Sequence, residues 1–273
     1  MEAWDRDLAL MEESIREAGR VVLSYFRPGE AVGGGARLQD KGRDNPLTQA
    51  DLEADALLRR TLLSARPDYG WLSEETADDA SRQDCRRVWV VDPIDGTKEF
   101  IIGLPQFAVS VGLVEDGVTV AGCILNPAQD ALYSAVAGGG ARLNGQPIRV
   151  TSRENLAGAS CLASRSETGR GEWDIFRDRL AITTMGSIAY KLALVASGGF
   201  DLTFTLTPKN EWDYCAGELL VREAGGRVTQ KDGQPLRFNR PHPSIRSVLA
   251  SNGLLHDPLL AMLRDVPYGP DKR

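Results

Sequence analysis

The sequence predicts a mixed α/β protein whose first half is of the α+β type and whose second half alternates strands with helices. Three observations support this prediction. Segments with helical spacing of apolar residues fill most of the first 65 positions, strand-like runs dominate residues 107–150, and strand and helix patterns alternate from residue 158 onward. We therefore expect an N-terminal α+β domain over residues 1–153 and a C-terminal α/β domain over residues 154–273.

Two helices are expected before residue 66. Residues 5–26 carry apolar side chains at helical spacing, and the sequence RPGE ends this helix. The second helix covers residues 47–65, with Thr48 as its N-cap residue. Between them, residues 29–45 are rich in glycine and charge and are expected to form an exposed loop. The sequence leaves open whether this loop closes over a site or binds a third metal ion.

Strands follow these helices. The sequence YGWLSEE, residues 69–75, is a short strand that ends in paired acids, and Val88–Val91 is a run of buried β-formers. Residues 107–127 contain two β runs joined by EDG, a turn sequence typical of hairpins. Residues 131–150 continue the strand pattern.

The second half begins with a strand at residues 158–165. The elements expected after it are a helix at 173–180, a helix at 186–198 that ends at glycine, a strand at 200–208 and a helix at 211–226.

The composition is that of a globular protein and restricts the partners. Of the 273 residues, 42% are hydrophobic and 26% charged, and the formal net charge is −6. Nucleic-acid polymers and anionic membranes both favour basic protein surfaces, so neither is expected as a partner. A small anionic substrate remains compatible, because bound metal ions reverse the local sign of charge.

Location and chemistry are restricted as well. No segment has the features of a secretory signal or approaches the roughly 18 apolar residues of a membrane span. The four cysteines are widely separated and include no CxxC pair, which favours buried thiols in a reducing cytosol. We therefore expect a cytoplasmic protein without an integral membrane segment. Only two histidines are present, so we expect the chemistry to depend on carboxylates.

The sequence DPIDGT, residues 92–97, is the first candidate site. Its proline fixes one φ angle, so Asp92 and Asp95 can face one point, with the carbonyl of Ile94 between them. Hard cations such as Mg²⁺ prefer oxygen ligands of this kind. GTKEFII then begins a helix, whose free N–H groups at Gly96 and Thr97 form an anion site. The alternative is a simple strand-to-helix turn, because Asp, Pro and Gly all favour turns.

Two further acids stand at element ends. Glu74 lies in WLSEE, where a solvated acidic turn is the more economical explanation. Asp213 lies in EWDYCAGELL, where a helix cap explains it as well as a metal ligand does. Their occurrence together with DPIDGT favours one shared metal site.

WLSEE, DPIDGT and WDYCAGELLVREAGG occur in the order and approximate spacing of a known superfamily. The sequence resembles, from NPLTQAD to AGG, the Mg²⁺-dependent, lithium-sensitive phosphatases that include inositol monophosphatase. This resemblance implies the layered αβαβα sandwich of the inositol monophosphatase and sugar phosphatase type. It also implies hydrolysis of a phosphate monoester by metal-activated water, with two or three Mg²⁺ ions. Family members are often homodimers, and their lithium sensitivity varies.

The resemblance also implies roles for individual residues. Glu74, Asp92 and the carbonyl of Ile94 would bind the first ion. Asp92, Asp95 and Asp213 would bind the second. Asp51 and Thr97, aided by Glu74, would orient and deprotonate the attacking water, and the amides of Gly96 and Thr97 would bind the phosphate. The expected substrate contacts are Glu74, Ile94, Asp95, Gly96, Thr97, Lys98, Gly186, Ser187, Lys191 and Asp213.

The substrate is inferred from two short segments. Lys-Glu-Phe after Thr97 resembles the 3′(2′),5′-bisphosphate nucleotidase branch, whereas inositol monophosphatases more often have Thr-Asn-Phe or Leu-Asn-Phe. GSIAYK places Gly186, Ser187 and Lys191 near a helix start, which is a reasonable second phosphate site, and Lys98 adds positive charge. Each lysine is equally well explained as a solvent-exposed helix residue.

We therefore expect removal of the 3′-phosphate from adenosine 3′,5′-bisphosphate, and from its sulfated precursor in sulfur metabolism. The close alternative is an inositol-1-phosphatase or a broad sugar phosphatase of the same fold. A non-catalytic regulator that responds to metal or phosphate is a third hypothesis. The presence of both Asp51 and Thr97 argues against it.

Overall fold

The computed structural model describes residues 3–31, 39–40 and 46–269. The loop expected at residues 29–45 falls mostly outside these ranges. Its described part contains β1 (Gln39–Asp40), which pairs antiparallel with β2 (Pro46–Leu47).

A seven-stranded sheet forms the centre of the first half. Its first two strands are parallel, which places the ends of both strands at the same edge, and every other neighbouring pair is antiparallel. In spatial order the strands are β3 (Gly70–Ser73), β4 (Arg87–Asp95), β5 (Ala108–Glu115), β6 (Val118–Asn126), β7 (Ala131–Val136), β8 (Ala141–Leu143) and β9 (Gln146–Ile148).

A five-stranded sheet forms the centre of the second half. The strand β10 is parallel to both of its neighbours, and the remaining pairs are antiparallel. In spatial order the strands are β11 (Leu180–Met185), β10 (Ala159–Ser164), β12 (Leu202–Thr205), β16 (Val248–Ser251) and β14 (Arg227–Thr229). A separate pair joins β13 (Lys209–Asn210) to β15 (Ser244–Ile245).

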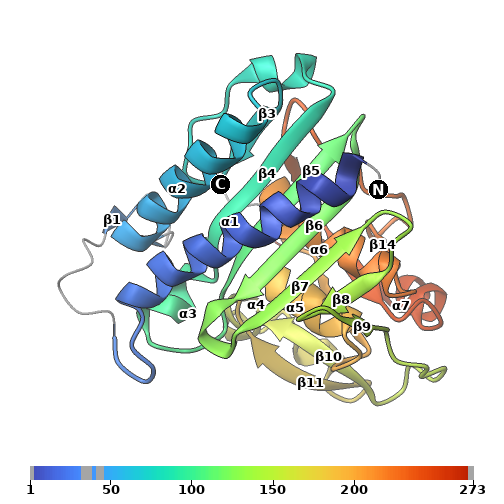
Figure 1. Cartoon of the computed structure of the whole chain (residues 1–273). Helices are drawn as coiled ribbons and strands as arrows, with labels where there is room; N and C mark the ends of the chain where they lie inside the picture. Colours follow the sequence, from blue (N-terminus) through green and yellow to red (C-terminus); the bar gives the residue numbers. More distant parts are fainter. Residues whose placement is uncertain (1–2, 32–38, 41–45, 270–273) are drawn as a thin grey trace.

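Helices form the layers around the two sheets (Figure 1). Long α1 and α2 cover one face of the larger sheet, and α5 with α6 lie between its other face and the smaller sheet. The outer face of the smaller sheet packs against α7. The helices are α1 (Ala3–Tyr25), α2 (Gln49–Ala65), α3 (Thr97–Ile101), α4 (Arg165–Gly169), α5 (Ile188–Ala196), α6 (Glu211–Glu223) and α7 (His256–Leu263), with short 3₁₀ turns η1 (Ala80–Asp84), η2 (Pro127–Gln129) and η3 (Asp174–Phe176). The αβαβα layering is therefore confirmed.

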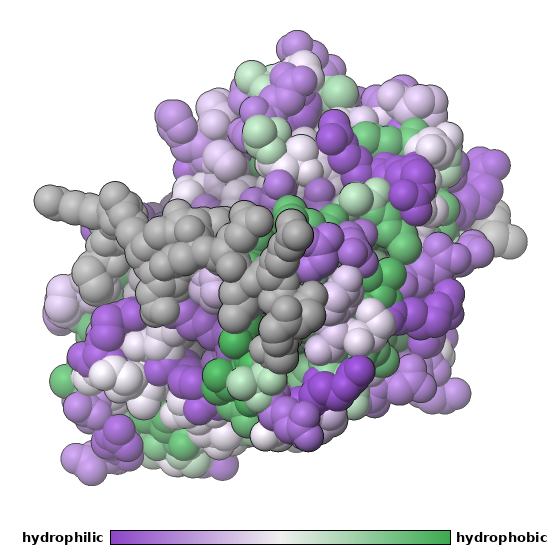
Figure 2. All heavy atoms as spheres, turned by 90° about the vertical axis from the view of Figure 1, so that its left-hand side faces the viewer, coloured by the Kyte–Doolittle hydropathy of each residue, from purple (hydrophilic) through white to green (hydrophobic). Residues whose placement is uncertain are grey.

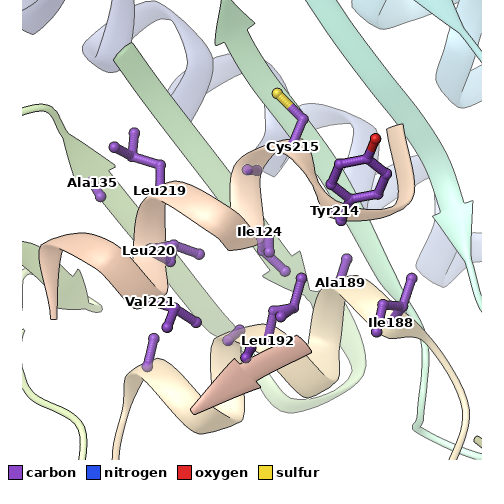
Figure 3. Packing of buried hydrophobic residues seen from close by; sticks show 14 of the residues in the cluster. Ile124, Ala135, Ile188, Ala189, Leu192, Tyr214, Cys215, Leu219, Leu220 and Val221 are labelled. Carbon is purple, nitrogen blue, oxygen red and sulfur yellow. The ribbon is translucent and has the colours of Figure 1, made fainter. Parts of the chain in front are cut away.

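The core between the sheets combines residues from both halves of the chain. Ile124 and Ala135 of the larger sheet belong to the same buried cluster as Leu192 of α5 and Leu220 of α6 (Figure 3). Burial of this apolar area is the main favourable contribution to keeping α5 and α6 on the sheet.

Close packing of α6 depends on glycines in the sheet. A Cβ at Gly112 would lie 2.5 Å from the Cys215 sulfur, and a Cβ at Gly122 would lie 3.1 Å from the Ala216 backbone. The missing side chains let the first turns of α6 approach the sheet. This approach fixes the position of Asp213 relative to the end of β4.

Most of the expected elements are confirmed. The expected helices at 5–26, 47–65, 186–198 and 211–226 correspond to α1, α2, α5 and α6. The EDG turn joins β5 to β6 through Asp116 and Gly117, whose positive φ angles of 50° and 78° suit a two-residue hairpin.

Two expectations need correction. The helix expected at 173–180 is wrong: this segment forms η3 and then enters β11, a strand that was not expected. Trp173, Phe176 and Leu180 do have helical spacing, but a 3₁₀ turn followed by a strand buries the same three side chains. The strand expected at Val88–Val91 is longer, because β4 continues through DPID to Asp95.

Hydrophilic side chains cover most of the face in Figure 2, with small hydrophobic groups between them. Within the described residues, no helix combines the length and apolar content needed to cross a membrane.

Candidate active site

A polar pocket opens where the end of β4 meets the starts of α3, α5 and α6. Its walls come from both halves of the chain, because residues 186–188, Lys191 and Asp213 line it together with Glu74 and residues 94–99. Ten expected site residues line it: Glu74, Ile94, Asp95, Gly96, Thr97, Lys98, Gly186, Ser187, Lys191 and Asp213. The other two, Asp51 and Asp92, are each 1% exposed and contact this group from behind the pocket wall.

An irregularity at the end of β4 brings its two aspartates to this pocket. The register with β5 shifts between Asp92 and Asp95, so DPID is a bulged strand end rather than a separate turn. The Ile94 N–H donates to Asp92 Oδ1 at 3.1 Å. Asp92 Oδ2 is buried and has no hydrogen-bond partner among the described residues. A buried carboxylate oxygen without a partner is costly, which indicates that a bound group completes the site.

The start of α5 orients Asp95. Its Oδ2 accepts hydrogen bonds from the Ser187 hydroxyl at 2.8 Å and from the Ala189 N–H at 2.6 Å. Ser187 has a φ of 53°, a strained value for a residue other than glycine, and such strain is common at functional sites. Because the Ser187 hydroxyl already donates to Asp95, its expected contact with substrate stays a prediction.

Two other carboxylates belong to helix capping boxes. Asp213, three residues after the N-cap of α6, accepts from the Asn210 N–H at 2.9 Å. Asp51, three residues after the N-cap of α2, accepts from the Thr48 N–H at 2.8 Å and from the Thr48 hydroxyl. A capping box fixes the carboxylate through one oxygen, so a second role for the other oxygen is compatible with it. The cap and ligand explanations of Asp213 therefore do not exclude each other.

Asp92, Asp95 and Asp213 form the acidic centre of the site. Each offers a carboxylate oxygen within 4.8 Å of the other two. Burial, reinforced by Glu74, raises the pKa of Asp92 well above its ordinary range. Burial, reinforced by Asp213, raises the pKa of Asp95 to about 6. Three converging carboxylates and one partnerless oxygen fit a hard divalent cation, which would compensate their repulsion.

Thr97 lies between Ile94 and Asp51. Its hydroxyl is 2.9 Å from the Ile94 carbonyl and 3.3 Å from Asp51 Oδ1, and its single proton can be donated to only one of them. Gly96 before it has a φ of 98°, and a Cβ there would lie 2.8 Å from the Gln106 carbonyl oxygen. Only glycine therefore fits at this position.

The pocket also contains four basic side chains. Lys98, Arg165, Lys191 and Lys209 all line it. Lys191 is only 2% exposed, and burial lowers its pKa although the nearby Glu167 opposes this shift. The ammonium of Lys209 lies 3.7 Å from the Glu167 carboxylate. The pocket thus joins an acidic centre to a set of cations.

Sequence reasoning missed Arg165 and Lys209. Arg165 follows the end of β10, which is parallel to both of its neighbours. Residues just beyond the carboxyl ends of parallel strands are frequent ligand contacts, and the predicted strand at 158–165 could have indicated this position. Lys209 follows Pro208 at the start of the two-residue strand β13, and no comparable signal marks it in the sequence.

Comparisons with known proteins agree with this geometry. A sequence profile of the inositol monophosphatase family matches residues 4–268. An inositol-1-monophosphatase of Rhizobium meliloti (strain 1021) is 38% identical over 234 residues, which cover 83% of this chain and 86% of that protein. A Nus factor SuhB of Xylella fastidiosa is 32% identical over 269 residues, which cover 95% of each protein.

Solved structures give the same result. The extragenic suppressor protein SuhB of Bartonella henselae superposes with a TM-score of 0.83 at 31% identity, covering 96% of this chain and 99% of that chain. An IMPase of Thermotoga maritima superposes with a TM-score of 0.82 at 29% identity, covering 97% and 98%. The chain belongs to the inositol monophosphatase family.

Proposed function

We propose that the chain is a Mg²⁺-dependent phosphate monoester hydrolase. The observation that carries this proposal is the acidic centre, where Asp92, Asp95 and Asp213 converge and Asp92 Oδ2 lacks a partner among the described residues. Carboxylates in this arrangement suit Mg²⁺, which usually completes its coordination with water and substrate phosphate.

The proposed ligands divide between two ions. Glu74, Asp92 and the Ile94 carbonyl would hold a first ion, and Asp92, Asp95 and Asp213 a second. Glu74 lies close enough to Asp92 to raise its pKa. Bound Mg²⁺ would make a nearby water more acidic and neutralise charge on the phosphoryl oxygens.

Asp51 and Thr97 would orient the attacking water. Asp51 is held from one side by Thr48, and its Oδ1 faces the Thr97 hydroxyl at 3.3 Å. When the Thr97 hydroxyl donates its hydrogen bond to Asp51, its oxygen can accept a hydrogen bond from water, and as water attacks, a proton would pass from water to Thr97 while the hydroxyl proton passes to the Asp51 carboxylate. Glu74, on the pocket wall, would assist. The amides of Gly96 and Thr97 belong to the first turn of α3, have no partner within the helix and would hold the phosphate.

For the substrate, we propose a 3′(2′),5′-bisphosphate nucleotide, with adenosine 3′,5′-bisphosphate as the test compound. The cations Lys98, Arg165, Lys191 and Lys209, which all line the pocket, support a substrate with a second anionic group. The alternative is hydrolysis of inositol 1-phosphate, which the names of several relatives favour.

A panel of substrates tests both levels of the proposal. Phosphate release is measured from adenosine 3′,5′-bisphosphate, inositol 1-phosphate and fructose 1,6-bisphosphate, each with Mg²⁺ and with a chelator. We expect release that requires Mg²⁺ and the highest kcat/KM for the nucleotide. The highest kcat/KM for inositol 1-phosphate would overturn the substrate assignment alone. Release that is unaffected by the chelator would overturn the metal assignment.

A further inference from the structure

Arg165 lines the pocket and is held by two hydrogen bonds. Its Nε donates to Glu99 Oε1 at 3.1 Å, and its Nη2 donates to Gln106 Oε1 at 2.6 Å. A guanidinium has five N–H donors, so three remain without a partner among the described residues. The side chain is 40% exposed and lines the pocket.

Glu99 is nearly buried, whereas Arg165 is partly exposed. The Glu99 side chain is 8% exposed, contributes to the pocket lining and is packed against Gly186. A Cβ at Gly186 would overlap the carboxyl carbon of Glu99, so the glycine provides the space for this carboxylate. Glu99 therefore fixes the guanidinium from its Nε side, and Nη1 has no hydrogen-bond partner among the described residues.

Gln106 connects Arg165 with the acidic centre. Its Oε1 accepts one hydrogen bond from Arg165 and another from the Gly186 N–H at 3.3 Å. Because both partners are N–H donors, the carbonyl oxygen of the Gln106 amide must face them. Ser187, the residue after Gly186, donates to Asp95. Through Gln106, Arg165 is thus connected to the segment that orients Asp95, the carboxylate that is expected to bind metal.

We propose that Arg165 is a specificity residue that binds the second anionic group of the substrate, and that Glu99 and Gln106 are positioning residues for it. This inference rests on the proposed phosphatase function. A guanidinium fork can bind a phosphate through two parallel hydrogen bonds, which a lysine cannot do. Because Arg165 acts at a group that does not react, it contributes binding that is equal in the ground state and the transition state.

A purely structural role makes a different prediction. If the Arg165–Glu99 pair only joined the two halves of the chain, its loss would lower stability and would affect all substrates alike. The specificity role and the structural role can be distinguished by comparing two substrates that share the reacting phosphate. Adenosine 3′,5′-bisphosphate has the second anionic group, and adenosine 3′-monophosphate lacks it.

The experiment compares kcat and KM for both compounds with Mg²⁺ in the wild-type chain, Arg165→Ala, Arg165→Lys and the control Arg177→Ala. Arg177 is a matched control, because it is 60% exposed, pairs with Asp174 and lies outside the pocket. We expect Arg165→Ala to raise KM for the bisphosphate about 10- to 100-fold, with little change in kcat. For the monophosphate we expect little change in either constant. Arg165→Lys should recover only part of the loss.

Variants of Glu99 test positioning. Glu99→Ala should lower the preference for the bisphosphate by a smaller factor than Arg165→Ala does. Glu99→Gln, which keeps an oxygen acceptor for Nε, should restore most of it. Circular dichroism spectra identify any variant that does not fold, and Glu99→Gln then provides the comparison.

The outcomes are distinct. If Arg165→Ala lowers kcat/KM equally for both substrates, or for neither, the inference is overturned while the phosphatase function stands. A wild-type chain that does not prefer the bisphosphate over the monophosphate would overturn it as well. Absence of Mg²⁺-dependent phosphate release from any compound would remove the proposed function, and the inference with it.

Discussion

Arg82 and the acidic centre are two buried polar groups close to the start of α6. They differ in whether hydrogen-bond partners and opposite charges compensate their own charge. Arg82 is 1% exposed, and it donates to Asp78, to the Asn239 side chain at 2.6 Å and to the Arg240 carbonyl at 2.9 Å. In the acidic centre, by contrast, Asp92 Oδ2 has no partner among the described residues, and carboxylates are its neighbours.

The pKa shifts express the same difference. The hydrogen bond to Asp78 raises the pKa of Arg82, so the fold favours the charged form. Burial raises the pKa of Asp92, so the fold disfavours the charged form there. A compensated buried network holds segments of the chain together, whereas a cluster of buried carboxylates is costly unless a bound cation offsets their repulsion. We therefore assign the first to stability and the second to function.

The largest effect is expected from Asp95→Asn. Phosphate release should fall by more than the roughly 10- to 100-fold that loss of an outer-shell contact costs, because a metal ligand is removed. The metal-free protein should stay folded and be at least as stable at pH 7, since one buried charge is gone. Activity assays and urea denaturation with a chelator measure both quantities. Retained activity would contradict the assignment of Asp95 as a metal ligand.

Thr97→Ala separates water activation from metal binding. We expect kcat to fall about 10²- to 10⁴-fold, because the partner of Asp51 in proton transfer is lost. Mg²⁺ affinity, measured by calorimetry, should change little. Thr97→Ser keeps the hydroxyl and is the matched control. Equal losses of Mg²⁺ affinity and turnover in Thr97→Ala would argue against the role with Asp51.

Arg82→Met tests the compensated network. Loss of the guanidinium leaves its partners unpaired, and we expect the free energy of unfolding to fall by about 3–5 kcal/mol. The exposed Arg86, which pairs with Glu115, is the control, and Arg86→Ala should cost less than about 1 kcal/mol. The folded fraction of Arg82→Met should keep its activity. Full stability of this variant would remove the contrast between the two networks.

Gly112→Ala tests whether packing of α6 connects stability to the site. The new methyl group would meet the Cys215 sulfur, and overpacking of this kind typically costs about 1–3 kcal/mol. Because Asp213 lies two residues before Cys215, Mg²⁺ affinity should weaken too. Gly138→Ala is a control in which a Cβ meets no atom within 4 Å, although its φ of 76° adds local strain. Unchanged Mg²⁺ affinity in Gly112→Ala would show that the site tolerates movement of α6.

The smallest expected effect is a dependence of stability on pH. The pKa of Asp95 is about 6 in the folded chain, above its ordinary value of 3.8, so between these values the folded state binds more protons than the unfolded state. Stability of the metal-free protein should therefore fall as pH rises through this window, by at least about 1 kcal/mol from this group. Asp95→Asn should remove that contribution. Denaturation with chelator at several pH values checks it, and identical profiles for both proteins would contradict the shift.

The sequence was sufficient where local rules determine the structure. Thr48 as N-cap, the EDG hairpin and the helix start after Gly96 depend on a few neighbouring residues, and all three are confirmed. The helix at 173–180 failed because its spacing of apolar residues suits a 3₁₀ turn and a strand as well as a helix. The domain boundary between residues 153 and 154 stays a prediction.

Long-range contacts could not be predicted. The approach of Arg165 to Glu99, which is 66 positions away, depends on how the two sheets pack, and the sequence contains no local signal for it. Ser187 likewise was expected to bind phosphate, and its contact with Asp95 depends on where α5 docks. The residues of the site could be named from motifs, whereas their partners required the fold.

Calorimetric titration of Mg²⁺ into the chelator-treated protein tests the central claim most directly. The titration compares the wild-type chain with Asp92→Asn and with Glu218→Gln, a carboxylate of the same helix as Asp213 whose side chain is 13% exposed and lies outside the pocket. We expect binding with proton release in the wild-type and control proteins, and loss of binding in Asp92→Asn. Equal Mg²⁺ binding by Asp92→Asn and wild type, or no binding by the folded wild-type protein, would contradict the assignment of the acidic centre as a metal site.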